Sequence, residues 1–389
     1  MNIRPEIAAR QGELTALRRD IHRHPETAFE EVRTADIVAE KLENWGLDVH
    51  RGLGKTGVVG TLRAGDSNRA IGLRADMDAL PVDELNSFDH RSVNDGKMHA
   101  CGHDGHTTML LGAARYLAEN RDFNGTIHFI FQPAEEMYGG AKYMIEDGLF
   151  EKVPVEGVWG MHNMPGLPAG HFSVASGPVM AAADEYRVQI TGVGGHAAFP
   201  HHAIDPVYIA SEIIVALQTI ASRRVDPLGS VVVSTTVLRA GNAGNVIPES
   251  AEMMGSARAF TIEMQDEIEG SIRRIAEGVA AAHGATAEVE YTRGYPPTIN
   301  HPAETEIARQ AAIRTVGAEN VGAHMLPMMA SEDFSFMLLE RPGCYLFIGN
   351  GEGDHAVECH NPHYDFNDDI LPIGARYWVN LVEDVFGAA

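Results

Sequence analysis

A short segment in the first third of the chain combines a thiol, three imidazoles and a carboxylate. It reads His-Ala-Cys-Gly-His-Asp-Gly-His from His99 to His106, and an apolar stretch with helical spacing follows it. The small residues between the polar ones let the backbone turn tightly, so that Cys101 and His103 can point at one centre. Thiolate and imidazole are ligands that zinc and similar divalent transition metals prefer. The segment therefore predicts part of a metal site, which other parts of the chain must complete.

Further carboxylates and an imidazole follow short apolar segments that are typical of buried strands. In an open α/β sheet, ligands collect at the carboxyl ends of the strands, so groups placed there can share one site. Adjacent glutamates in a non-helical turn point in different directions, so one can bind a metal while the other moves protons. The groups are Asp76 and Asp78 after residues 70–74, Glu135 and Glu136 after residues 125–131, and His162 after residues 157–161.

Several polar residues also have a simpler structural interpretation. Either aspartate alone is more often a capping residue of a helix or a turn. His22 and His24 precede Pro25, and we expect them in a polar loop that ends the first helix. His196, beside two glycines, is about as often a surface loop residue as a functional one. A single arginine such as Arg258 is more often a surface residue than a ligand.

The order of the predicted elements indicates two domains. Residues 184–293 read as strand, helix, strand, strand, helix and strand, which is the ferredoxin-like arrangement. This segment begins and ends at neighbouring places, as an inserted domain does. Residues 1–183 and 294–389 would then form one discontinuous α/β domain with a mixed sheet.

Composition restricts the partners and the compartment. The 389 residues carry a formal charge of −24, which argues against nucleic acid or an anionic membrane surface as the main partner. A small anionic ligand stays compatible, since its site needs only one well-placed arginine. Three widely spaced cysteines are not a disulfide framework and indicate a reducing compartment. Because no apolar run of about 18 residues is present, we expect a cytoplasmic protein without membrane contact.

Eight segments, in order along nearly the whole chain, resemble the successive motifs of the M20D metallopeptidases. That group includes hippurate hydrolases, N-acyl-amino-acid amidohydrolases and plant auxin-conjugate hydrolases. Each motif alone is weak, whereas eight in order are very specific. The segments are Arg74–Pro81, His99–His106, Gln132–Glu136, Met161–Asn163, Gly194–Ala198, Gly244–Pro248, Ser331–Phe334 and His360–Asn367.

The resemblance implies a dinuclear metal site and a general base. Glu135 would be that base, and Cys101 would bridge the two metals. Asp78 lies in the segment of a ligand-orienting aspartate, and Asp76 stands where relatives outside the subgroup have a metal-binding histidine. His99 and His106 match motif positions that are not ligands, and we expect them, with Asp104, to shape the turn. The implied ligands are Cys101, His103, Glu136, His162 and His360.

The resemblance also assigns roles within the inserted domain, which would serve as a lid and a dimerisation domain. His196 would reach the active site of the partner subunit and stabilise the oxyanion, which predicts a homodimer with shared sites. An edge of the domain's sheet is the natural dimer surface, because its backbone groups are unpaired. Asn245 and Arg258 would bind the substrate carboxylate, for which a guanidinium is well matched.

The activity that the resemblance implies is metal-dependent hydrolysis of the amide bond of N-acyl-L-amino acids. Two divalent ions per subunit are expected, and cysteine, histidine and glutamate together suit zinc, manganese, cobalt or nickel. Enzyme alternatives on the same machinery are a carboxypeptidase or dipeptidase and an N-acetyl-diaminopimelate deacetylase. A metal-dependent ligand-binding protein without catalysis is the alternative from another class. Glu135 disfavours that alternative, because a binding protein has little reason to keep a general base beside intact ligands.

Overall fold

The computed structural model describes residues 4–322 and 326–387, which group into two compact units. The first unit consists of Met1–Gly177, Asn300–Leu326 and Asp333–Ala389, and the second of Pro178–Ile299 and Pro327–Glu332. Each unit has a hydrophobic core of its own. The boundaries predicted at residues 184 and 293 stay a prediction of where an inserted domain begins and ends.

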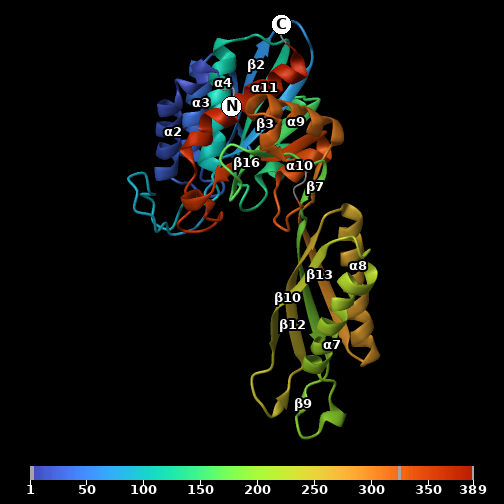
Figure 1. Ribbon diagram of the computed structural model, residues 1–389. Coiled ribbons are helices and arrows are strands. Elements are labelled where there is room, and N and C mark those ends of the chain that lie inside the picture. The colour runs from blue at the N-terminus through green and yellow to red at the C-terminus, as the bar shows by residue number, and fades with distance from the viewer. Residues whose placement is uncertain (1–3, 323–325, 388–389) are drawn as a thin grey trace. The chain divides into compact units, whose positions relative to one another are not determined.

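An eight-stranded mixed sheet forms the centre of the first unit (Figure 1). Its strand order is β1-β2-β4-β3-β5-β16-β6-β15. The pairs β3/β4, β3/β5 and β5/β16 are parallel, whereas β1/β2 and β2/β4 are antiparallel. The predicted mixed α/β class is therefore confirmed. The strands are β1 (Asp48–Leu53), β2 (Gly57–Ala64), β3 (Ala70–Asp76), β4 (Gly125–Gln132), β5 (Gly157–Pro165), β6 (Phe172–Ser173), β15 (Val321–Gly322) and β16 (Gly343–Gly351).

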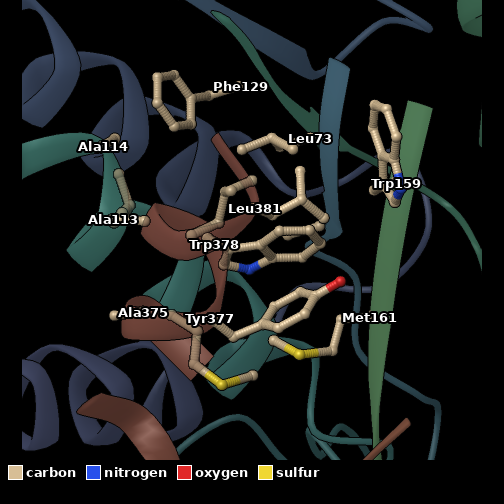
Figure 2. Packing of buried hydrophobic residues seen from close by; sticks show 14 of the residues in the cluster. Leu73, Ala113, Ala114, Phe129, Trp159, Met161, Ala375, Tyr377, Trp378 and Leu381 are labelled. Atoms are coloured by element: carbon tan, nitrogen blue, oxygen red, sulfur yellow. The ribbon is translucent and has the colours of Figure 1, made fainter. Parts of the chain in front are cut away.

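Helices complete the core of the first unit. Helix α11 is buried from Leu371 to Val382, as expected for a helix that is apolar nearly all round. Figure 2 shows Tyr377 and Trp378 of α11 packed with Leu73 of β3 in this core. The helices are α1 (Pro5–Ala8), α2 (Gln11–Arg23), α3 (Val32–Asn44), α4 (His103–Glu119), α5 (Gly140–Glu146), α6 (Leu149–Lys152), α9 (Pro302–Val316), α10 (Phe334–Glu340) and α11 (Leu371–Phe386).

Helix α4 begins inside the segment rich in histidine, before the apolar stretch that predicted it. Its N-cap, Gly102, has a φ of 91°, a backbone conformation that glycine adopts without strain. A Cβ atom at this position would also lie 2.3 Å from Asn163 Nδ2 and 2.5 Å from the Tyr364 hydroxyl. The tight turn into α4 therefore requires glycine for two independent reasons.

The second unit contains a four-stranded antiparallel sheet with two helices packed against it. The sheet order is β10-β12-β8-β13, and the chain order β8-α7-β10-β12-α8-β13 confirms the predicted ferredoxin-like arrangement. Alternate residues of β8 and β12 are buried, as expected for a sheet with one covered face. The elements are β8 (Ala183–Thr191), α7 (Pro206–Thr219), β10 (Val231–Ala240), β12 (Ser250–Ala259), α8 (Ile262–Ala282) and β13 (Thr286–Tyr295).

The described residues also form two short two-stranded ladders. One pairs β9 (Gly195–His196) with β11 (Val246–Ile247), and the other pairs β7 (Gly177–Met180) with β14 (Thr298–Asn300). Within the described part of the chain, the helices are too short or too polar to span a bilayer.

Candidate metal centre

The predicted ligands come together where strands of the first unit end. Strand β3 ends at Asp76 and its parallel neighbour β4 ends at Gln132, immediately before the turn that carries the two glutamates. Strand β5 is parallel to β3, and His162 lies within β5. Because parallel strands place their carboxyl ends at one edge of the sheet, these side chains share one location.

Two groups of three possible ligands share Cys101. One consists of Cys101, His103 and His162, and the other of Cys101, Glu136 and His360. The ligand atoms within each group lie within 4.8 Å of one another. The Cys101 Sγ atom is 3.4 Å from His162 Nε2, and Glu136 Oε2 is 3.3 Å from His360 Nε2. The structure thus brings together all five residues that the sequence predicted as ligands.

The donor set fits a divalent transition metal. Among the residues that the structure describes, His103 Nε2 and Glu136 Oε1 are buried without a hydrogen-bond partner. These atoms are 3.8 Å apart, and unpaired polar atoms in such a position are unfavourable unless a cation binds them. Interaction with the Cys359 thiol, together with burial and the charge of Glu136, raises the pKa of the Cys101 thiol. A bound cation opposes that effect, because it favours the thiolate.

The histidines are in states that suit coordination. Burial, followed by the charge of His106, lowers the pKa of His162 well below its usual value, so the ring is neutral. Its Nδ1 donates to the Asn163 carbonyl at 2.6 Å, which leaves Nε2 facing Cys101. Burial opposes protonation of His103, but Asp76 and other carboxylates outweigh it and raise the pKa of this imidazole. A divalent cation would take the place of that proton in balancing the carboxylates.

Asp78 holds two predicted ligands at once. Its Oδ1 lies 3.2 Å from His103 Nδ1, and its Oδ2 accepts a hydrogen bond of 2.9 Å from the Glu136 backbone N–H. A carboxylate on the second ring nitrogen fixes the orientation of a ligating histidine and increases its basicity. Asp78 therefore couples the start of α4 to the turn after β4.

Asp76 is buried next to the predicted ligands, and each of its two carboxylate oxygens already has a partner. One carboxylate oxygen contacts His106 Nδ1 at 2.6 Å, and the other accepts from Arg74 Nη1 at 2.7 Å. The other ring nitrogen of His106 accepts from the Asn163 backbone N–H at 2.9 Å. Asp76, His103 and His106 also lie within 4.8 Å of one another. Because two of these three residues are satisfied by hydrogen bonds, we assign this group a structural role.

His360 reaches the site from the far end of the chain. Its backbone N–H donates to the Ala100 carbonyl at 2.7 Å, which ties residues 359–360 to the segment before α4. Its φ is 66°, an uncommon value for a residue with a side chain, and such conformations concentrate at functional sites. The side chain is 55% exposed, so this predicted ligand lies on the solvent side of the group.

Glu135 is buried beside the predicted ligands. It forms a group within 4.8 Å with His103 and Glu136, which places a carboxylate next to the donor atoms. The preceding residue, Ala134, has a φ of 54°, and this left-handed residue turns the chain between Pro133 and Glu135. Both glutamates thus follow directly after this turn.

Glu31 supports this turn, although no pattern in the sequence indicates such a role. It is fully buried, and its two carboxylate oxygens accept from the Ala134 N–H at 2.9 Å and from Thr56 Oγ1 at 2.8 Å. Burial, followed by the charge of Asp78, raises the pKa of Glu31 to about 7. In the sequence it is one of two adjacent glutamates in a polar segment, which is typical of an exposed position.

A buried network of charged residues also contacts the first turn of α4. The expectation that His22 lies in a polar loop is wrong, because it is fully buried within α2. It contacts Asp104 at 2.9 Å and Glu84 at 3.2 Å. Burial opposes protonation of His22, but the hydrogen bonds to Asp104 and Glu84 raise its pKa to about 9. Arg18 adds a second cation, 3.6 Å from Asp104.

His24 and His99 take no part in the donor groups. His24 Nδ1 contacts the Asp20 carbonyl at 2.8 Å near the end of α2. His99 is buried, and within the described ranges neither of its ring nitrogens has a hydrogen-bond partner. Burial lowers the pKa of His99 to about 3, so its ring is neutral.

Three predicted site residues lie in the second unit. His196 pairs with Val246 between β9 and β11, and the Asn245 carbonyl accepts from the Ala197 N–H at 3.0 Å. The structure therefore brings His196 and Asn245 close together at the β9/β11 ladder. Arg258, on β12, donates to Ser331 Oγ at 3.4 Å. The roles of His196, Asn245 and Arg258 at the metal site stay predictions.

The substitution Glu31→Gln tests the raised pKa of the carboxylate that accepts a hydrogen bond from the turn before Glu135. Glu31 binds a proton more tightly in the folded chain, so its contribution to wild-type stability falls as the pH rises from about 4.5 to about 7. The variant lacks this loss, so its stability relative to wild type should increase across that window by up to roughly 3 kcal/mol. Urea unfolding of metal-free protein at several pH values measures the difference. Parallel profiles for the two proteins would contradict it, and Glu30→Gln is the exposed control.

Comparisons with known proteins agree with this geometry. Residues 72–384 match the model of peptidase family M20/M25/M40. The chain is 44% identical over 381 residues to a hippurate hydrolase of Campylobacter jejuni, with 98% of each chain covered. It is 39% identical to an IAA-amino acid hydrolase of Arabidopsis thaliana, covering 95% of this chain and 84% of that protein.

A solved structure supports the same relationship. A dinuclear metal-binding peptidase of the M20 family from Bacillus subtilis is 34% identical, with a TM-score of 0.86. The alignment covers 98% of this chain and 100% of that one. The family that the eight motifs predicted is confirmed: the chain belongs to peptidase family M20/M25/M40.

Proposed function

We propose that this protein is a metal-dependent amidohydrolase that cleaves the amide bond of N-acyl-L-amino acids. The observation that carries the proposal is the pair of donor groups that share Cys101, with the buried carboxylate of Glu135 beside them. The relatives named hippurate hydrolase and IAA-amino acid hydrolase support this substrate class. Both names describe an amino acid whose nitrogen carries an acyl group.

Two divalent ions per subunit would be held by the two donor groups. Cys101, His103 and His162 would hold one ion, and Cys101, Glu136 and His360 the other, with the thiolate of Cys101 shared. Such ions lower the pKa of a coordinated water and polarise the scissile carbonyl. Thiolate, imidazole and carboxylate together are compatible with zinc, manganese, cobalt or nickel.

Glu135 would act as the general base and then as the acid. Its carboxylate takes a proton from the attacking water and delivers that proton to the departing amine nitrogen. This role requires a carboxylate that is close to the donor atoms and not itself bound to metal. Glu136 cannot exchange roles with it, because one Glu136 oxygen already contacts His360 and the other points toward His103.

His196 would stabilise the oxyanion in the active site of a partner subunit. Its Nδ1 accepts a hydrogen bond of 3.0 Å from the Ala198 backbone N–H, so the neutral ring carries its proton on Nε2. That N–H is a donor suited to a developing negative charge on the substrate oxygen. We therefore propose a homodimer in which residues 184–293 form the lid and dimerisation domain.

Asn245 and Arg258 would bind the carboxylate of the amino-acid part of the substrate. The hydrogen bond that Arg258 donates to the Ser331 hydroxyl is long, at 3.4 Å, and engages only one of its guanidinium nitrogens. A guanidinium can bind a carboxylate through two parallel hydrogen bonds, which would select substrates with a free carboxyl group. Such selection fits an overall acidic protein that accepts an anionic substrate.

Replacing Glu135 with Gln tests the proposed activity. The variant should retain its metal, measured by plasma mass spectrometry, and lose turnover by roughly 10²- to 10⁴-fold, since general base catalysis contributes about that much. N-acetyl, N-benzoyl and indole-acyl amino acids should be assayed after metal reconstitution, with dipeptides alongside. Glu151→Gln, at an exposed position of α6, is the matched control.

Two results would contradict this assignment. A fully active Glu135→Gln variant would exclude Glu135 as the base. Hydrolysis of dipeptides with no turnover of any N-acyl amino acid would replace the amidohydrolase with a peptidase.

Mixing two inactive variants tests the shared active site. In a hybrid dimer of His196→Ala and Glu135→Gln, one site receives both an intact glutamate and an intact partner histidine. Random exchange makes half of the dimers hybrids, so activity should recover to roughly a quarter of wild type. Native mass spectrometry with isotope-labelled subunits confirms the exchange. Complete exchange without recovery would argue against a histidine donated by the partner.

A further inference from the structure

Two cysteines that are far apart in the sequence lie together at the proposed metal site. The Cys359 Sγ atom is 3.9 Å from the Cys101 carbonyl oxygen. The neighbouring residues are also paired, through the hydrogen bond of 2.7 Å from the His360 N–H to the Ala100 carbonyl. Cys101 Sγ lies within 4.8 Å of the ligand nitrogen of His360. The segment at 359–360 therefore lies along the segment at 100–101.

The three cysteines differ in their access to solvent. Cys344 is fully buried in the central sheet, and its thiol contacts the Tyr345 carbonyl at 3.7 Å. Cys101 is 8% exposed, whereas Cys359 is only partly buried. A dissolved oxidant would therefore reach Cys359 first. The thiol next to Cys359 is that of Cys101, whereas Cys344 takes no part in the pair. Cys344 thus serves as an internal reference.

We propose that Cys101 and Cys359 form an oxidation-sensitive pair that a hydroperoxide converts into a disulfide. The formation of the disulfide depends only on the two thiols. Its consequence, the loss of a metal ligand, depends on the metal site of the proposed function. Oxidation of the pair would stop the activity, and reduction of the disulfide would restore it.

The reaction proceeds in two balanced steps. The Cys359 thiolate attacks the O–O bond of the hydroperoxide, which forms a sulfenic acid and releases an alcohol, or water from hydrogen peroxide. The Cys101 sulfur then attacks the Cys359 sulfur, forms the S–S bond and displaces water from the sulfenic acid. The two thiol protons end on the two departing oxygens. Both sulfurs are oxidised by one electron each, and the peroxide accepts the two electrons.

Oxidation would affect both donor groups, because they share Cys101. A disulfide sulfur carries no negative charge and is a poor ligand compared with a thiolate. Each group would be left with two donors, His103 with His162 and Glu136 with His360. The new bond would also restrain the residue before His360. We therefore expect oxidation to release metal as well as to stop turnover.

Peroxide treatment of metal-free and metal-loaded protein tests the proposal. Of the three thiols, two should disappear in the metal-free protein under denaturing thiol titration, and peptide mapping should show Cys101 linked to Cys359 within one chain. The metal-loaded protein should react more slowly and release its metal in step with disulfide formation. Dithiothreitol followed by metal should restore both thiols and metal content.

Variants distinguish the pair from general oxidation damage. Cys359→Ser should keep its metal and its basal activity and form no intramolecular disulfide. Cys344→Ser should behave as wild type. Retention of all three thiols in metal-free wild type, or a disulfide between Cys359 residues of two chains, would overturn the pair. A Cys101–Cys359 disulfide that forms with full retention of metal would overturn the proposed consequence and the role of Cys101 as a ligand.

Discussion

The attraction between a cation and a group of buried donors is the interaction on which this site depends. Carboxylates, imidazoles and one thiol converge at the edge of the central sheet, and two of their atoms are buried without a partner among the described residues. Unpaired buried polar groups are unfavourable, and like charges in a low dielectric repel each other. A divalent metal relieves both effects at once. The fold therefore positions the donor atoms, and a bound metal would provide the positive charge that they lack.

Buried hydrogen bonds hold in place the residues around these donors. Asp78 ties His103 to the glutamate turn, and Glu31 holds the same turn. In addition, His22 and Arg18 fix Asp104 in the first turn of α4. Such contacts restrict the donors to a few orientations, which reduces the entropy that metal and substrate binding must overcome.

The residues proposed as ligands and the folds of the two units could be identified from the sequence because each left a local signal there. Cys101 and His103 stand in a dense cluster of polar residues that core packing does not require, and Glu136 and His162 follow or lie in apolar strands. Glu31 and His22 left no such signal, because their roles depend on contacts with residues that are distant in the sequence. The α4 helix begins earlier than its apolar pattern, since its first turn is polar and is stabilised by tertiary contacts. Asp76 could not be placed for the same reason: its partners, Arg74 and His106, decide its orientation.

Cobalt titration of the metal-free protein tests the shared thiolate most directly. Optical spectroscopy reports sulfur coordination as a charge-transfer band, and calorimetry counts the ions bound. We expect two equivalents of cobalt per chain in the wild-type protein and a charge-transfer band that is absent from Cys101→Ser. Saturation without that band in wild type, or binding in Cys101→Ser with unchanged stoichiometry and affinity, would contradict a site organised around Cys101.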